Sequence, residues 1–240
     1  MGWFSSACSF VSSCVSSVGS AIASTVGSIG SALSSFATTV APALGSILSR
    51  IPPIFGVISV WANAIGMLLN VLRPDEKVED IGDRALQAAE QDIKPEKFED
   101  FDQYMQALRD FKLNPEASEK TSPVEKLVSG MGVTTLGMEE KFNLERGSLN
   151  SIWLLPIANA DYFTPERIKA LLENGKTIGD VGAYLEKRLS GAEASALRKN
   201  LEVTPEGKPM NDSQLGTLHS ALDHARSAWA KLDQQLKNND

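Results

Sequence analysis

The side chains that most often perform catalysis or bind metals are few in this chain of 240 residues. It has two histidines, His219 and His224, and two cysteines, Cys8 and Cys14. Five residues apart on a helix, the histidines differ by about 140° around the axis, so they do not form the i, i+4 pair that binds zinc. The cysteines would lie about 9 Å apart along a helix axis, too far for a disulfide. We therefore expect neither a metal site nor a disulfide.

Motifs for other chemistries are also missing from the sequence. It contains no glycine-rich phosphate loop, no GxSxG nucleophile elbow and no HExxH. We therefore expect no catalytic residues, no cofactor and no enzymatic activity. The segment from Asp75 to Asp102 holds eleven acids and four bases, an excess equal to the net charge of −7. Because no basic patch remains to bind phosphates, we expect no sequence-specific nucleic-acid binding.

The charged residues divide the chain into two kinds of segment. Among the 23 Lys and Arg and the 30 Asp and Glu residues, only Arg50 lies within residues 1–72. We predict an all-α fold, in which a long N-terminal amphipathic helix and a hydrophobic, possibly transmembrane helix precede a charged helical bundle. The predicted parts are a Ser/Gly/Ala-rich arm (1–49), a hydrophobic membrane segment (50–72), an acidic helical pair (73–112), a linker (113–122) and a helical domain ending in a heptad helix (123–240).

The arm has the periodicity of one amphipathic helix over residues 8–40, ended by Ala41-Pro42. Its apolar stripe recurs about every 3.6 residues: Val11, Val15, Val18, Ile22, Val26, Ile29, Leu33, Phe36 and Val40. The opposite face holds Ser, Thr and Gly without a single charge, similar to helices that sense lipid-packing defects. Small residues spaced by four allow close helix packing. We predict lipid binding or self-association through this stripe; the alternative is packing against the protein's own bundle.

The next segment, Ile54 to Leu72, has no charge and is flanked by Arg50 and Arg73. A helix of this length spans about 29 Å, close to the hydrocarbon thickness of a bilayer. The residues predicted to contact the membrane are Ile54, Phe55, Trp61, Leu68 and Leu69. Asn63 and Asn70 oppose the prediction because each amide needs a partner in hydrocarbon. The alternatives are a membrane-inserted helix and a buried helix of a water-soluble assembly.

The charged remainder has the start and stop signals of several helices. Ser122-Pro123 with Glu125, Thr164-Pro165, Thr177 with Asp180, and Ser190 with Glu193 each predict a helix start, and Gly130 predicts the end of the first helix. The last helix carries a strict heptad stripe of Leu215, Leu218, Leu222, Ala225, Trp229, Leu232 and Leu236. Such a stripe indicates either a bundle face or a coiled coil that sets the oligomer number.

In style, residues 1–72 resemble the membrane-penetration or DNA-pilot proteins of phages and viruses, which often start with Gly/Ala/Ser-rich amphipathic helices. The resemblance implies a virion component that inserts into or crosses a host membrane, forms homo-oligomers or joins a larger protein assembly, and aids genome delivery. Its partners would be a lipid bilayer and other protein copies, and its location the virion and then the host membrane. The alternatives are a structural assembly protein whose arm packs into neighbouring subunits without lipid, and a pore-forming toxin.

Overall fold

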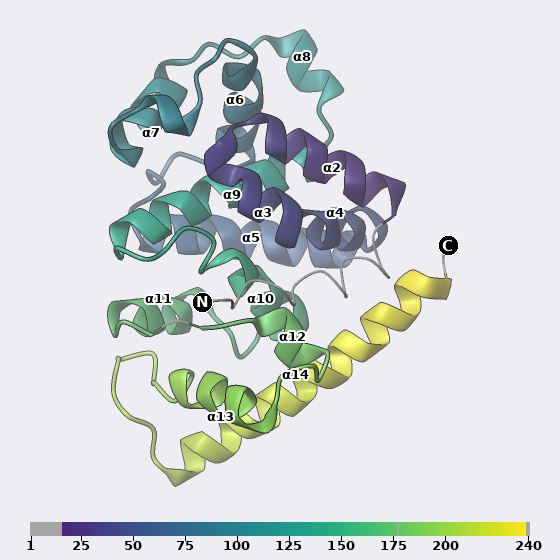
Figure 1. The fold of residues 1–240 in the computed structure, drawn as a ribbon, viewed down its shortest axis with the longest axis vertical. Coiled ribbons are helices and arrows are strands. Elements are labelled where there is room, and N and C mark those ends of the chain that lie inside the picture. The colour runs from purple at the N-terminus through teal and green to yellow at the C-terminus, as the bar shows by residue number, and fades with distance from the viewer. Residues whose placement is uncertain (1–15, 177, 239–240) are drawn as a thin grey trace. The chain divides into compact units, whose positions relative to one another are not determined.

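The computed structural model describes residues 16–176 and 178–238, and these residues form an all-helical structure (Figure 1). The predicted all-α fold is therefore confirmed. The described residues divide into two compact units, one within Val15–Asn150 and one within Ser151–Asp240. We call them the N-terminal unit and the C-terminal unit. The uncharged helices, the acidic pair and the first helix after the predicted linker all belong to the N-terminal unit.

The N-terminal unit is built around one buried helix. Its elements are α2 (Ser17–Ser28), η1 (Ser31–Leu33), α3 (Ser34–Thr39), α4 (Ala41–Arg50), α5 (Pro52–Leu68), α6 (Val78–Glu90), η2 (Pro95–Lys97), α7 (Phe101–Asp110), α8 (Pro115–Lys120) and α9 (Pro123–Lys141). Every residue of α9 from Leu127 to Glu139 is buried. Helices α2, α4, α5, α6 and α7 all pack against it. Helix α9 is thus the core of the unit.

The prediction of one helix over residues 8–40 is wrong for the residues that the structure describes. Helix α2 ends at Ser28, and the chain restarts as η1 and α3 after Gly30. The carboxylate of Glu96 approaches the break closely, because a Cβ on Gly30 would lie 2.4 Å from its Oε2. Glu96 Oε1 accepts a hydrogen bond from Ser31 N (2.9 Å) and caps the new turn. The apolar periodicity continues through the break because each piece turns the same stripe toward the core.

The predicted helix over residues 54–72 is wrong at its C-terminal end. Helix α5 starts at Pro52, where the proline pair suits a helix start, but it ends at Leu68. Asn70 adopts a left-handed conformation with φ 54°, which the short amide side chain tolerates. The N–H groups of Val71 and Leu72 both donate to Gly66 O (2.9 and 3.0 Å) and so close the helix end.

Helices α6 and α9 are in backbone contact where they cross. A Cβ on Gly82 would lie 1.9 Å from the carbonyl oxygen of Lys126, and a Cβ on Gly130 would lie 1.9 Å from that of Val78. The prediction that Gly130 ends a helix is therefore wrong, because α9 continues to Lys141. Glycine inside a helix costs about 1 kcal/mol relative to alanine. At this position it permits the close crossing.

The predicted linker over residues 113–122 contains a helix that is fixed to α6. Asn114 caps α8, and its Oδ1 accepts from Glu116 N (2.9 Å). The hydroxyl of Ser118 donates to the buried carboxylate of Asp83. Lys126 donates to Ser118 Oγ (2.9 Å) and pairs with Asp83 Oδ2 (2.8 Å). The segment is therefore part of the N-terminal unit, because its polar groups complete a cluster shared by α6 and α9.

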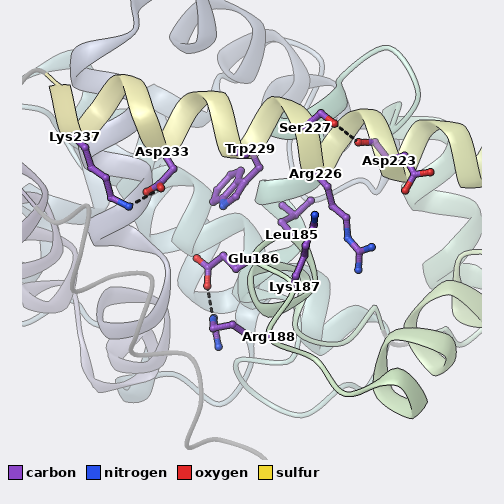
Figure 2. A pocket seen from close by; sticks show the side chains of 11 residues that line it. Leu185, Glu186, Lys187, Arg188, Asp223, Arg226, Ser227, Trp229, Asp233 and Lys237 are labelled. Carbon is purple, nitrogen blue, oxygen red and sulfur yellow. Dashed lines mark hydrogen bonds and ion pairs between the residues drawn. The ribbon is translucent and has the colours of Figure 1, made fainter.

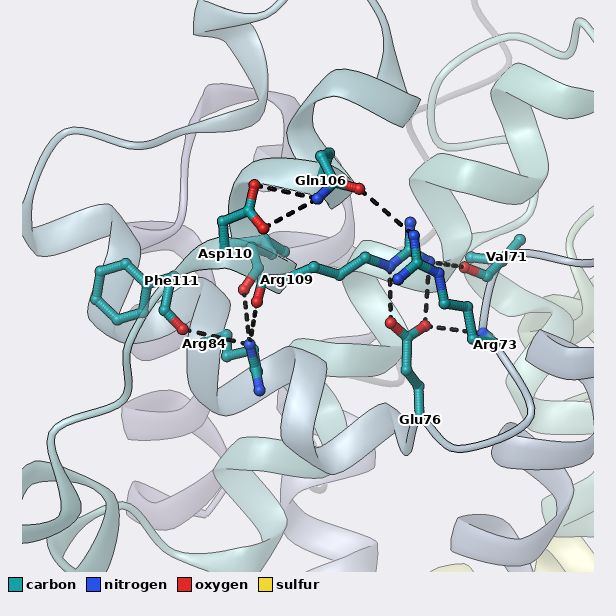
Figure 3. Close-up of polar contacts among 9 residues, drawn as sticks. Val71, Arg73, Glu76, Arg84, Gln106, Arg109, Asp110 and Phe111 are labelled. Carbon is teal, nitrogen blue, oxygen red and sulfur yellow. Dashed lines mark hydrogen bonds and ion pairs between the residues drawn. The ribbon is translucent and has the colours of Figure 1, made fainter.

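Two arginines hold the C-terminal end of α7 (Figure 3). Nη1 of Arg84 donates to three carbonyl oxygens there, those of Leu108 (3.1 Å), Arg109 (2.7 Å) and Phe111 (3.3 Å). Such carbonyls have no partner within the helix. Arg109 donates to both carboxylate oxygens of Glu76 (2.7 and 3.0 Å). Burial raises the pKa of Glu76, but the hydrogen bonds from Arg109 and from Arg73 N, together with the charges of both arginines, outweigh it and hold that pKa below its usual value.

Replacement of Arg84 by methionine is expected to lower the free energy of unfolding by about 1–3 kcal/mol, because the α7 carbonyls lose a charged donor. Urea unfolding followed by far-UV circular dichroism measures this change. Arg84→Lys keeps the charge without the planar guanidinium, so it should recover only part of the loss. An unchanged unfolding midpoint for Arg84→Met would contradict the role of this cap.

The C-terminal unit contains shorter helices packed beside one long helix. After η3 (Asn150–Trp153) it comprises α10 (Leu154–Asn159), α11 (Pro165–Glu173), α12 (Val181–Leu185), α13 (Gly191–Asn200) and α14 (Asp212–Asn238). The predicted starts at Thr164 and Ser190 are present, the latter as a capping box with Glu193. Helix α12 is capped by Asp180, and the predicted cap Thr177 lies outside the described residues.

Candidate membrane-active surface

Most of the predicted membrane stripe is buried inside the N-terminal unit. Its described members from residue 22 onward are each at most 3% exposed, namely Ile22, Val26, Ile29, Leu33, Phe36 and Val40. Val18 is 47% exposed, whereas Val11 and Val15 lie outside the described residues. In this structure the stripe is therefore not a free surface, because the chain's own body covers it.

The contacts of the stripe show how the cover is made. A Cβ on Gly45 of α4 would lie 2.9 Å from Cδ1 of Ile22 on α2. A Cβ on Gly132 of α9 would lie 2.7 Å from Cδ2 of Leu33 and 3.2 Å from Cδ1 of Phe36. Residues 17–49, which we call the uncharged layer, thus pack against one another and against α9. Glycines at the contact points bring the helices close.

Five of the twelve hydroxyl groups of the uncharged layer donate to carbonyl oxygens within its own helices. Four of them donate to the carbonyl oxygen four residues earlier: Thr25 to Ala21 (3.0 Å), Thr38 to Ser34 (2.9 Å), Thr39 to Ser35 (2.6 Å) and Ser46 to Pro42 (2.9 Å). Between helices, Ser16 Oγ and Ser46 Oγ are 3.1 Å apart. These side chains therefore need no water to satisfy their donors.

A few polar contacts fasten the uncharged layer to the rest of the unit. Besides the bond from Ser31 N to Glu96, Thr25 Oγ1 lies 3.3 Å from Glu125 Oε1. Nδ2 of Asn150 lies 2.9 Å from Ser35 Oγ and 3.0 Å from Thr39 Oγ1. Burial raises the pKa of Glu96, but the bond from Ser31 N and other hydrogen bonds outweigh it and lower that pKa. The remaining contacts are predominantly apolar.

Helix α5 differs from the uncharged layer because part of its apolar surface is open. The predicted contact residues lie on its inner side or its flanks: Trp61 and Leu69 are buried, and Ile54, Phe55 and Leu68 are half-buried. Val57, Val60 and Met67 are 48%, 71% and 38% exposed. Sequence reasoning missed these three, although their spacing of three and seven residues already placed them on one helix face.

The polar side chains of α5 are turned toward α6. Ser59 Oγ donates to Glu79 Oε1, and Asn63 Nδ2 donates to Glu79 Oε2 (3.2 Å). Asn63 Oδ1 accepts from Val78 N (2.7 Å) at the start of α6. The amide of Asn63, one of the two that argued against a membrane helix, therefore has its partners within the chain. Because these groups all lie on one flank, the open face of α5 is apolar.

Within the described residues, no individual helix has both the length and the apolar composition to cross a bilayer. The stretch Ser31–Thr39 followed by Ala41–Arg50 meets the criteria as a pair, with a bend of 57° between the two parts. Pro52–Leu68 is apolar but shorter.

The predicted heptad stripe of α14 is almost entirely buried. Leu218, Leu222, Ala225, Trp229, Leu232 and Leu236 are buried, and Leu215 is half-buried. Helix α14 packs against α10 and α12. The structure therefore uses this stripe as a bundle face, and a coiled coil through the same residues would require its exposure.

A cavity of about 690 Å³ lies between residues 185–188 and α14 (Figure 2). Its charged groups largely pair with one another: Arg188 binds Glu186, and Lys237 Nζ lies 2.6 Å from Asp233 Oδ2. Burial raises the pKa of Glu186 despite the opposing Arg188. His219 and His224 are exposed. No group of three or more His, Cys, Asp or Glu side chains in the described part of the chain could hold a metal ion.

The sequence matches no known protein-family model, and neither a curated protein nor a solved structure matches it. Its functional interpretation therefore depends on the physical chemistry of the uncharged layer and of α5.

Proposed function

We propose that the chain is a non-enzymatic, phage-like virion component that inserts its uncharged helices into a host membrane, self-associates there and aids genome delivery. The observation that supports the proposal most is the absence of charged residues from the uncharged layer. Residues 17–49 carry no charge, and five of their twelve hydroxyl groups donate to carbonyl oxygens of the same helices. A hydroxyl group that donates within its own helix can enter hydrocarbon at low cost, whereas an unsatisfied polar group costs several kcal/mol there.

The absence of charge makes the transfer of this layer into lipid inexpensive. Each Lys, Arg or Asp at the centre of a membrane helix costs about 2.5–3.5 kcal/mol on insertion scales. The uncharged layer would bring no such residue, and Arg50 follows it at the end of α4, where a long side chain can reach the headgroups. The layer also supplies enough length, because its bent helix pair meets the length and composition criteria for a membrane span.

Insertion requires the N-terminal unit to open, since the stripe is buried against α9 in water. The expected order of events is therefore a water-soluble form that buries the uncharged layer, followed by release of the layer at a bilayer. Few polar contacts oppose release: those of Glu96, Glu125 and Asn150. Small residues facing outward on α2, such as Ser20, Ser24 and Gly27, would then allow close packing between copies.

A disulfide that keeps α2 packed against α4 tests the proposal, because α4 covers the α2 part of the stripe and must separate from it before that part can face lipid. The hydroxyl oxygens of Ser16 and Ser46 are 3.1 Å apart, so sulfurs in their place are within reach of a bond. In a chain with Cys8 and Cys14 changed to serine, Ser16→Cys with Ser46→Cys should link the start of α2 to α4. We expect the oxidised protein to release no dye from loaded vesicles, and a reductant to restore release.

The single variant Ser46→Cys, oxidised in the same way, is the matched control and should release dye normally. Equal release by the locked and reduced proteins would refute insertion by opening of the layer. If neither form releases dye and the chain forms large oligomers without lipid, the layer serves assembly instead.

A further inference from the structure

We infer that the open face of α5 is a docking surface for a neutral lipid bilayer and makes the first contact before the uncharged layer is released. The inference deepens the proposed function, but it concerns binding to the membrane rather than insertion. The face consists of Pro53, Val57, Val60, Ala64 and Met67, which we call the α5 face. They recur at steps of four and three along the helix and so lie on one side of it.

Exposure distinguishes the α5 face from the rest of the uncharged segment. Val60 is 71% exposed, the largest value among the big apolar side chains of the described residues, and Val57 and Met67 lie on the same side. Gly56, beside them, has no heavy atom within 4 Å of the position of a Cβ. The described part of the N-terminal unit therefore does not cover this side of α5.

The chemistry of the face excludes a polar partner. Helix α5 has no charged residue, and its Ser59 and Asn63 side chains are engaged by Glu79 and by Val78 N. A partner on the open side would find neither a hydrogen-bonding side chain nor an ion pair. Binding there depends on removing apolar surface from water alone.

The area of the face favours lipid over another protein. A helix of 17 residues is about 25 Å long and about 10 Å wide, so one face buries roughly 250 Å². A stable protein interface buries about 800 Å² on each partner. Binding to a bilayer does not need an interface of that area, because an apolar helix face of this size can insert about 5–10 Å into the boundary between headgroups and acyl chains.

The charges around the face favour neutral headgroups. Glu79 lies on the flank of α5, and Asp80 is exposed in the first turn of α6. Lys141, which donates to Leu69 O (2.6 Å), and the flanking Arg50 and Arg73 add cations at the two ends of the helix, but the chain as a whole carries −7. The net charge therefore gives the chain no overall attraction to anionic lipid, and we expect packing defects in a neutral bilayer to be sufficient for binding.

The test is flotation of the full chain, locked by the engineered disulfide between positions 16 and 46, with phosphatidylcholine vesicles. Val57→Asp with Val60→Asp should lower the partition coefficient by about a hundredfold, a factor of about ten for each valine removed from lipid. Val18→Asp is the matched control, because Val18 is 47% exposed and Val57 48%, but on different helices. It should float like the parent protein, and circular dichroism should show all variants folded.

Each outcome separates docking from insertion. Equal flotation of the double variant and its parent would overturn the inference, as would binding only to vesicles that contain anionic phosphatidylserine. If sedimentation without lipid shows a dimer that the double variant abolishes, the face belongs to a second copy and the inference is also overturned. Dye release by the locked protein refutes the proposed insertion but leaves the flotation result as evidence for docking.

Discussion

Replacement of Gly130 by alanine is expected to lower the free energy of unfolding of the N-terminal unit by roughly 3 kcal/mol. The added Cβ would lie 1.9 Å from Val78 O, a backbone atom that cannot move without displacing α6. Alanine favours helix over glycine by about 1 kcal/mol, so the steric cost must exceed this gain. Urea unfolding followed by circular dichroism measures the net change.

Two further glycines make this prediction specific. Gly82→Ala should have an effect of similar size, because its Cβ would lie 1.9 Å from Lys126 O on the opposite side of the crossing. Gly56→Ala on α5 meets no atom within 4 Å and should instead stabilise the helix by about 0.5–1 kcal/mol. A Gly130→Ala protein as stable as the Gly56→Ala protein would show that α6 and α9 do not cross in this way.

Replacement of Asp83 by asparagine is expected to cost about 2–3 kcal/mol, because it leaves the Lys126 ammonium without its buried partner. Asp83 is 3% exposed and pairs with Lys126 at 2.8 Å. Its other partners are Gln87, which donates to Oδ1 (3.1 Å), and Ser118. The cluster joins α6, α8 and α9, so its loss should loosen the whole charged side of the N-terminal unit.

The effect of Asp83 should depend on pH in a defined direction. Burial raises the pKa of Asp83, but Lys126, Ser118 and Gln87 together outweigh it, so that pKa is below its usual value in the folded protein. A depressed pKa stabilises the fold above the unfolded pKa of about 3.9, and this stability is lost as the pH falls through the folded pKa. The difference between parent and Asp83→Asn should therefore be constant near neutrality and shrink below about pH 4.

A double-mutant cycle with Lys126→Met provides the control. If the two side chains interact as the structure has them, the double variant should be less destabilised than the sum of the single variants. Additive losses, or a difference between parent and Asp83→Asn that persists in acid, would contradict the ion pair.

The helical class and several helix starts could be predicted from sequence because they depend on local chemistry. The capping boxes at Ser122 and Ser190 are present, since the residues that form each box lie within four positions. Helix breaks were harder to predict. The chain turns at Gly30 because Glu96, which is distant in sequence, approaches its backbone, and no local pattern reports such an approach.

The role of α9 was also beyond local reasoning. Gly130 has the same appearance in sequence whether it ends a helix or permits a crossing, and only its contact with Val78 O distinguishes the two. The candidate surface shows a similar limit. Periodicity identified the apolar stripe correctly but not which part of it the body covers, so the buried Ile22 and Ile29 were named while the exposed Val57 and Val60 were not.

The position of α9 in the chain has a consequence for synthesis. The uncharged layer is complete at residue 49, but its cover, α9, ends at Lys141. At about 5–20 residues per second, the ribosome needs on the order of 5–20 seconds to make the intervening segment. During that interval the helices of the nascent layer can pack against one another, but the side that α9 covers has no partner. Each newly made copy therefore exposes that apolar side of the layer until translation delivers α9.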